Sequence, residues 1–165
     1  MVIGIDPGLM GAIVRISDGD VFDMKDMPVV YIKKGKSGKN MYDIVSICNI
    51  LRELNTGKIY AYVEKTQPMR GVRVQASWGL GYCEGMLVGM LAMLNIPYEL
   101  IHPKKWHNYF GIVKSKGDYK VQAYQIAKQL FPQAELTGPK GGLKDGRSDA
   151  LLIAEYGRRH LQGEM

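Results

Sequence analysis

Short apolar runs separated by turn residues occupy the first part of the chain. Residues 2–6, 11–16 and 20–27 contain Val and Ile and are divided by Pro7-Gly8 and Ser17-Asp18-Gly19. Short runs of this kind, joined by tight turns, are typical of an antiparallel three-strand meander. The sequence therefore predicts that the chain begins with β structure.

Beyond residue 40, helical and strand patterns alternate. Ile44, Ile47, Cys48 and Leu51 follow a helical period, and the helix is expected to end before Asn55. Strands followed by alternating helices and strands indicate an α/β fold with a mixed sheet flanked by helices. The further predicted elements are a helix over 41–54, a strand over 58–63, a helix over 76–94, a strand over 97–101, and helices over 118–131 and 147–161.

Two segments stand apart from this alternation. Residues 33–39 contain four lysines and two glycines with nothing apolar, so we expect a mobile loop, either a solvated connection or a loop that touches DNA. Gly81, Gly85 and Gly89 share one face of the predicted helix 76–94. Each glycine destabilises a helix by about 1 kcal/mol relative to Ala, so three on one face indicate a compensating contact. This face therefore predicts close approach by another backbone, either that of the sheet or that of a second subunit.

Length and charge narrow the class of protein. The 165 residues predict one domain, 1–165, and 22 Lys and Arg against 16 Asp and Glu favour a polyanionic partner. Two cysteines in helix-like contexts make a disulfide framework or a zinc site unexpected, and a cytoplasmic setting fits. No basic segment precedes the first apolar run, and the longest apolar stretch, near 86–94, is interrupted by Gly89, so secretion and membrane insertion are not expected.

Four acids lie where such a fold gathers its functional side chains. Asp6 and Glu64 each end a predicted strand, while Asp145 and Asp149 stand four residues apart at the start of the last helix. If strands 2–6 and 58–63 are parallel neighbours, Asp6 and Glu64 project from adjacent carboxyl ends, roughly 4.8 Å apart. The sequence therefore predicts a cluster of carboxylates.

Clustered carboxylates repel one another, and a divalent cation resolves the conflict. Hard oxygen ligands suit Mg²⁺, and two such ions about 4 Å apart activate water and stabilise the leaving oxygen in phosphodiester cleavage. Each acid also has a structural alternative. Asp6 could start a turn, Glu64 could be a surface charge, Asp145 could cap the last helix, and Asp149 could pair with Lys144 or Arg147.

The same residues resemble RuvC-type Holliday junction resolvases of the RNase H-like superfamily, especially the small phage and bacterial branch. The similarity runs through most of the chain in order. It is carried by Ile3-Gly4-Ile5-Asp6-Pro7-Gly8, Tyr62-Val63-Glu64, residues 79–85, Ile96-Pro97-Tyr98-Glu99-Leu100, residues 103–106, Gln129-Leu130-Phe131-Pro132 and the final helix from Asp149 to Arg159.

The resemblance implies an RNase H-like mixed five-stranded sheet and a homodimer that binds four-way DNA junctions. It also implies paired symmetric nicks made with Mg²⁺ or Mn²⁺, two ions per site, in a bacterium or a phage-infected cell. Asp6, Glu64 and Asp149 match the family's acids directly. The family's fourth acid lies three residues before the helix acid, where this chain has Gly146, so Asp145 is the nearest candidate.

The resemblance also points to basic residues for DNA binding. Arg70 and Arg73 lie in the region that meets the junction core in this family, and Lys116 and Lys120 lie where the family places basic residues near a helix start. The four predicted DNA contacts are therefore Arg70, Arg73, Lys116 and Lys120, with Lys116 a candidate to neutralise the scissile phosphate.

Other functions are compatible with parts of this pattern. A related nuclease for other branched DNA or RNA, and a junction-binding protein that does not cleave, would both share the fold. Gly4-Ile5-Asp6-Pro7-Gly8 also resembles the phosphate-binding start of actin/hexokinase-type ATPases. Those enzymes hold nucleotide between two related domains, whereas this chain has room for one and lacks a second Asp-x-Gly segment placed for the other half.

Overall fold

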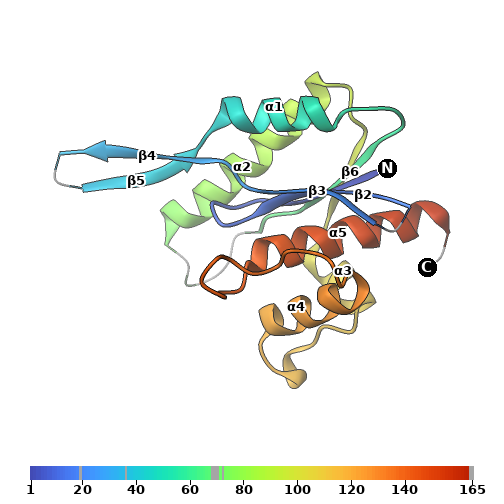
Figure 1. Ribbon diagram of the computed structural model, residues 1–165. Coiled ribbons are helices and arrows are strands. Elements are labelled where there is room, and N and C mark those ends of the chain that lie inside the picture. Colours follow the sequence, from blue (N-terminus) through green and yellow to red (C-terminus); the bar gives the residue numbers. More distant parts are fainter. Residues whose placement is uncertain (19, 36, 68–70, 72, 164–165) are drawn as a thin grey trace.

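A computed structural model describes residues 1–18, 20–35, 37–67, 71 and 73–163. A five-stranded mixed sheet in the order β3-β2-β1-β6-β7 lies between two layers of helices (Figure 1). The five-stranded α/β architecture predicted from the sequence is confirmed. The strands of the sheet are β1 (Val2–Asp6), β2 (Ala12–Ser17), β3 (Asp20–Asp26), β6 (Tyr60–Glu64) and β7 (Tyr98–Ile101).

The helices cover both faces of this sheet. In Figure 1, α1 and α2 lie on one side, and α3, α4 and α5 lie on the other. The helices are α1 (Ile44–Leu54), α2 (Val74–Met93), α3 (Pro103–Tyr109), α4 (Tyr119–Leu130) and α5 (Asp145–Gln162), with a 3-10 turn η1 (Lys114–Lys116) before α4. Within the described residues, none of the helices combines the length and the apolar character that a bilayer crossing requires.

Each face of the sheet has its own hydrophobic core. Because side chains alternate along a strand, β1 sends Ile3 and Ile5 toward α1 and α2, and Val2 toward α5. The helix α5 is buried over most of its length, from Gly146 to Gly157, and it packs across β1, β2 and β6. The central strands and α5 therefore form a rigid frame for the residues at their ends.

Strand β1 pairs antiparallel with β2 and parallel with β6. Its register with β6 places Ile5 opposite Val63, so Asp6 and Glu64 end neighbouring strands at the same edge of the sheet. The predicted three-strand meander and the parallel pairing of the strands that carry Asp6 and Glu64 are both confirmed.

The prediction of a mobile loop at 33–39 is wrong. Strands β4 (Val29–Lys34) and β5 (Ser37–Tyr42) pair with each other as a separate two-stranded sheet. The error has a physical reason: the described residues between 33 and 39 have no core beneath them, so they lack the apolar alternation by which strands are usually detected. The hairpin also explains why α1 starts at Ile44 rather than near residue 41.

The glycine face of α2 is open. A Cβ atom added at Gly81, Gly85 or Gly89 would meet no atom within 4 Å. The sheet is therefore not the neighbour that these glycines were expected to approach. Large apolar side chains extend the same exposed surface, with Trp78 69% and Met93 83% exposed.

Candidate active site

The four predicted acids come from three elements that meet at one end of the sheet. Asp6 is the last residue of β1 and Glu64 is the last residue of β6. Asp145 and Asp149 stand one helical turn apart at the start of α5. The charges of Glu64, Asp145 and Asp149 all act on Asp6, so the structure brings the four carboxylates within electrostatic reach of one another.

Small residues allow α5 to lie directly on the sheet. A Cβ atom at Gly4 would stand 2.1 Å from the carbonyl oxygen of Ala150, so β1 and α5 touch through their backbones. A Cβ atom at Gly146 would stand 2.2 Å from the carbonyl oxygen of Met10 and 2.6 Å from Gly11 Cα. Neither position has room for a side chain, and this close contact carries the helix acids to the strand ends.

The packing of Gly146 explains the unusual position of the fourth acid. An acid three residues before Asp149 would have to occupy the space of the β1–β2 turn. Asp145 is the first residue of α5 and lies outside that contact, and it is partly exposed. The acid one position earlier is therefore the one that this packing permits.

Burial and mutual repulsion disfavour the charged forms of these acids. Burial raises the pKa of Asp6 well above its usual range, and the charges of Asp149 and Glu64 raise it further. Burial, together with the charges of Glu64 and Asp145, raises the pKa of Asp149 to about 7. Burial also raises the pKa of Glu64, although a hydrogen bond from Trp106 opposes the change. The cluster thus needs a proton or a cation to be stable.

Two of the acids already have fixed partners. The indole Nε1 of buried Trp106 donates a hydrogen bond of 2.8 Å to Glu64 Oε2. The ammonium of Lys120, on α4, forms an ion pair with Asp145, and this bond raises the pKa of Lys120. Trp106 orients one strand acid, and Lys120 places a positive charge beside the cluster.

The donor set fits a hard divalent cation. Carboxylate oxygens are the ligands that Mg²⁺ and Mn²⁺ prefer, and repelling acids with raised pKa values are what a bound cation would relieve. In the part of the chain that the structure describes, no three His, Cys, Asp or Glu side chains are close enough to form a ready metal group.

A polar clamp fixes the start of α5. Asp26, at the end of β3, accepts hydrogen bonds from Lys144 Nζ at 3.0 Å and from Arg147 Nε at 2.6 Å. Arg147 also donates to the carbonyl oxygen of Glu135 at 2.8 Å. Lys144 and Arg147 therefore pair with Asp26, and the alternative that they pair with Asp149 is wrong.

The cap alternative for Asp145 is also wrong. The N-cap position of α5 belongs to Lys144, whose side chain makes no capping hydrogen bond, and Asp145 is the first helical residue. Its carboxylate contacts Lys120 on a different helix. Asp145 is therefore available to the acid cluster.

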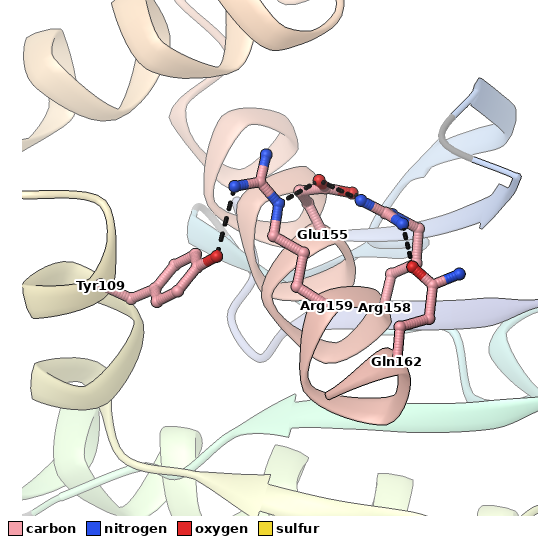
Figure 2. Close-up of polar contacts among 5 residues, drawn as sticks. All are labelled: Tyr109, Glu155, Arg158, Arg159 and Gln162. Atoms are coloured by element: carbon pink, nitrogen blue, oxygen red, sulfur yellow. Dashed lines mark hydrogen bonds and ion pairs between the residues drawn. The ribbon is translucent and has the colours of Figure 1, made fainter. Parts of the chain in front are cut away.

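The opposite end of α5 is anchored by a second polar group. Figure 2 shows Glu155 between the guanidinium groups of Arg158 and Arg159, with Arg159 reaching Tyr109 on α3 at 3.2 Å and Arg158 bonded to Gln162. Burial raises the pKa of Glu155, but the bonds from both arginines outweigh it and hold that pKa below its usual range. This group ties α5 to α3.

Comparison with known proteins bears on the fold. No protein-family model matches the sequence, and no curated protein matches it. Thermus thermophilus RuvC in complex with a Holliday junction substrate has a TM-score of 0.59 at 15% identity, covering 99% of this chain and 95% of that chain. A further Thermus thermophilus RuvC structure gives 0.57 at 16% identity over 96% of each chain. The yeast mitochondrial Holliday junction resolvase Ydc2 gives 0.55 at 17% identity, covering 99% and 84%.

This chain has a RuvC-type fold. The similarity extends over nearly its whole length, and it confirms the RNase H-like architecture that the sequence resemblance implied. At this level of identity the match establishes the fold alone, so the roles of individual residues rest on the geometry of the acid cluster.

The predicted DNA-binding residues fall in different places on this RuvC-type fold. Arg70 lies outside the described residues. Arg73 is exposed and immediately precedes α2, and Lys116 is exposed in η1. Lys120 lies in the first turn of α4 and contacts Asp145, so it is the predicted cation closest to the acids.

Two supporting residues were not predicted from the sequence. Trp106 lies within a segment that matched the family, but its bond to Glu64 joins residues that are far apart in the chain. Asp26 ends β3, at the end of the predicted strand 20–27, and that position is the one sequence signal that could have drawn attention to it.

Proposed function

We propose that this protein is a structure-selective DNA endonuclease that resolves four-way junctions by metal-dependent phosphodiester hydrolysis. The observation that carries the proposal is the cluster of four acids at the carboxyl ends of β1 and β6 and at the start of α5, on a RuvC-type fold. Similar structures include a RuvC bound to a Holliday junction substrate and a mitochondrial Holliday junction resolvase, and the basic charge of this chain suits the same class of substrate.

In this proposal Asp6, Glu64 and Asp149 hold Mg²⁺ or Mn²⁺, two ions per site, and Asp145 completes the ligand set. When bound, such ions lower the pKa of water to give a nucleophile and neutralise charge that develops on the phosphate. Trp106 keeps the Glu64 carboxylate aimed at the cluster through its 2.8 Å hydrogen bond.

The cations beside the acids position the DNA. Lys120 stands at the edge of the cluster, and Lys116 lies in the turn that precedes the same helix. Both ammonium groups would contact the backbone phosphates at the cleavage site, with Lys116 neutralising the scissile phosphate. Binding through phosphates is strongly weakened by salt.

Paired nicks in opposed strands require two sites, and we propose that a homodimer supplies them through α2. Gly81, Gly85 and Gly89 leave room for another backbone, and exposed apolar side chains border them. A two-fold contact through this face would present two equivalent acid clusters.

The dimer is tested by replacing one glycine of the face. Gly85→Glu removes helical glycine and so favours the isolated helix, yet it places a charge in the proposed contact. Light scattering should show a dimer for the wild type and a monomer for the variant, while the matched Gly142→Glu, at an open loop position, stays dimeric. A wild-type monomer at micromolar concentration that still makes paired nicks would contradict the dimer.

The activity is tested with labelled four-way junctions, forks, linear duplex and RNA, each with and without Mg²⁺. We expect Mg²⁺-dependent nicks in opposed strands of the junction, lost in Asp149→Asn and retained in the surface control Asp20→Asn. Cleavage of RNA alone, or of forks in preference to junctions, would show that the four-way junction is not the preferred substrate. Tight junction binding without cleavage would identify a binding protein.

A further inference from the structure

The β4–β5 hairpin is a free-standing ribbon. Its strands pair in full register from Val29 opposite Tyr42 to Lys34 opposite Ser37. Figure 1 shows it projecting away from both layers of helices. Among the described residues, no other strand or helix packs broadly against it.

The ribbon exposes more than a strand pair normally does. Tyr31 is 65% exposed and Ile32 is 46% exposed, and these neighbours point to opposite faces. Two-stranded hairpins are at best marginally stable in water without a surface to pack on. A ribbon with apolar groups exposed on both faces is therefore suited to being covered by a partner.

The charge of the ribbon selects the kind of partner. The sequence from Met27 to Tyr42 contains four lysines and no acid. Cross-strand partners share a face, so Tyr31, Asn40 and Lys33 lie on one side, and Ile32 and Lys39 lie on the other. Cations on both faces, with no acid between them, match a partner whose negative charges surround the ribbon.

The base of the ribbon is connected to two segments that adjoin the acid cluster, the β1–β2 turn and the start of α5. Met27 N donates to Gly11 O at 2.9 Å, and Gly11 lies in the turn that follows Asp6. Asp26, one residue earlier, holds the start of α5. In Figure 1 the ribbon accordingly leaves the molecule at the end where α5 begins.

We propose that the β4–β5 ribbon lies in a groove of one duplex arm of the branched DNA. This inference rests on the proposed function. A six-residue strand is about 20 Å long, and a two-stranded ribbon fits a major groove that is about 12 Å wide. Tyr31 and Asn40 then face the base edges, and the long side chains of Lys33 and Lys39, one from each face of the ribbon, reach phosphates on the groove walls.

The test measures the salt dependence of junction binding. Lys33→Ala with Lys39→Ala removes two phosphate contacts, and Arg52→Ala with Lys58→Ala removes two cations from a surface outside the ribbon as a control. Both pairs are built in the Asp149→Asn background, which prevents cleavage. Each phosphate contact contributes about 0.9 to the slope of log K against log salt. The ribbon variant should therefore lose about 1.8 from that slope.

In practical terms, wild-type affinity should fall about tenfold more than that of the ribbon variant between 50 and 200 mM salt. The control pair should follow the wild type, and melting temperatures should agree because Lys33 and Lys39 lie outside both cores. An unchanged slope on DNA that the unaltered protein binds would overturn the ribbon's role and leave the proposed function standing.

Two further results would distinguish a subunit contact made by the ribbon from a failure of the proposed function. Dissociation of a dimer by the ribbon variant, seen by light scattering, would make the ribbon a contact between subunits and overturn the inference. If the unaltered protein does not prefer junctions to linear duplex, the proposed function fails. A slope loss of about 1.8 on linear duplex would then still support groove binding by the ribbon.

Discussion

Asp149→Asn is expected to abolish nicking and to raise the melting temperature of the metal-free protein above neutral pH. The amide has nearly the shape of the carboxylate but no charge. Burial, with the charges of Glu64 and Asp145, raises the pKa of Asp149 to about 7. Removing that charge therefore relieves the cost of burying it and the repulsion from its neighbours, which the folded protein bears and the unfolded chain does not.

The magnitude follows from proton linkage. The pKa of an aspartate is about 3.9 in the unfolded chain, so between pH 4 and pH 7 the folded protein holds this proton more tightly than the unfolded chain. The destabilisation is absent below about pH 4, grows as pH rises, and is complete above the folded pKa. It then reaches about 4 kcal/mol. For a chain of this size, a destabilisation of about 4 kcal/mol lowers the melting temperature by about 8–16 °C. This range is an upper bound, because the neighbouring acids adjust their own protonation when Asp149 ionises.

Thermal unfolding at pH 5 and pH 8, each with EDTA or Mg²⁺, provides the assay. The variant should melt well above the wild type at pH 8 in EDTA and about a third as far above it at pH 5. Added Mg²⁺ should narrow the gap at pH 8, because a cation that binds the folded wild type stabilises it by mass action. Asp20→Asn should match the wild type throughout. A variant that melts at or below the wild type at pH 8 in EDTA would refute the argument that burial and repulsion make the Asp149 charge destabilising.

Three other substitutions test neighbouring features. Asp145→Asn should slow nicking severely, though less than loss of Asp149, and raise the Mg²⁺ concentration needed; full activity in a Mg²⁺ titration would remove Asp145 from the site. Trp106→Phe deletes the donor to Glu64, and hydrogen bonds to charged groups contribute about 1.5–3 kcal/mol, so the nicking rate should fall about tenfold or more with junction affinity unchanged; an unaltered rate would contradict its positioning role. Glu155→Gln should lower the melting temperature at pH 7 by several degrees, because the ion pairs hold the pKa of Glu155 below its usual range; the difference should start to shrink as pH falls through the unfolded pKa of about 4.3 and disappear below the lower folded pKa, so a difference that does not shrink in acid would argue against the ion pairs.

The strands and the helix that carry the acids could largely be predicted, because local sequence patterns mark them. Asp6 and Glu64 each follow a short apolar run, and the parallel pairing of their strands follows from ordinary α/β connections. The helix that carries Asp149 has a clear amphipathic start. The strand ends and the start of the last helix are marked by residues that are close together in the sequence. One amino-acid sequence is therefore enough to predict them.

The rest depends on contacts between distant segments. The bond from Trp106 to Glu64 and the clamp between Asp26 and Arg147 join residues that are far apart in sequence. The shift of the fourth acid to Asp145 has its cause in the contact of Gly146 with the β1–β2 turn, which no local pattern encodes. Such contacts become visible only when the chain is folded.

The free-standing β4–β5 hairpin makes one part of this molecule open to change. Apart from Tyr42, which packs against the core on the α1 and α2 side, the described residues of segments 29–34 and 37–42 contribute nothing to either core beside the five-stranded sheet. Lengthening, shortening or exchanging the hairpin between Val29 and Met41 therefore leaves both cores intact, as is usual for insertions at exposed connections. Natural variation and protein engineering can both act on this appendage as an interchangeable module while the five-stranded sheet and its four carboxylates are inherited unaltered.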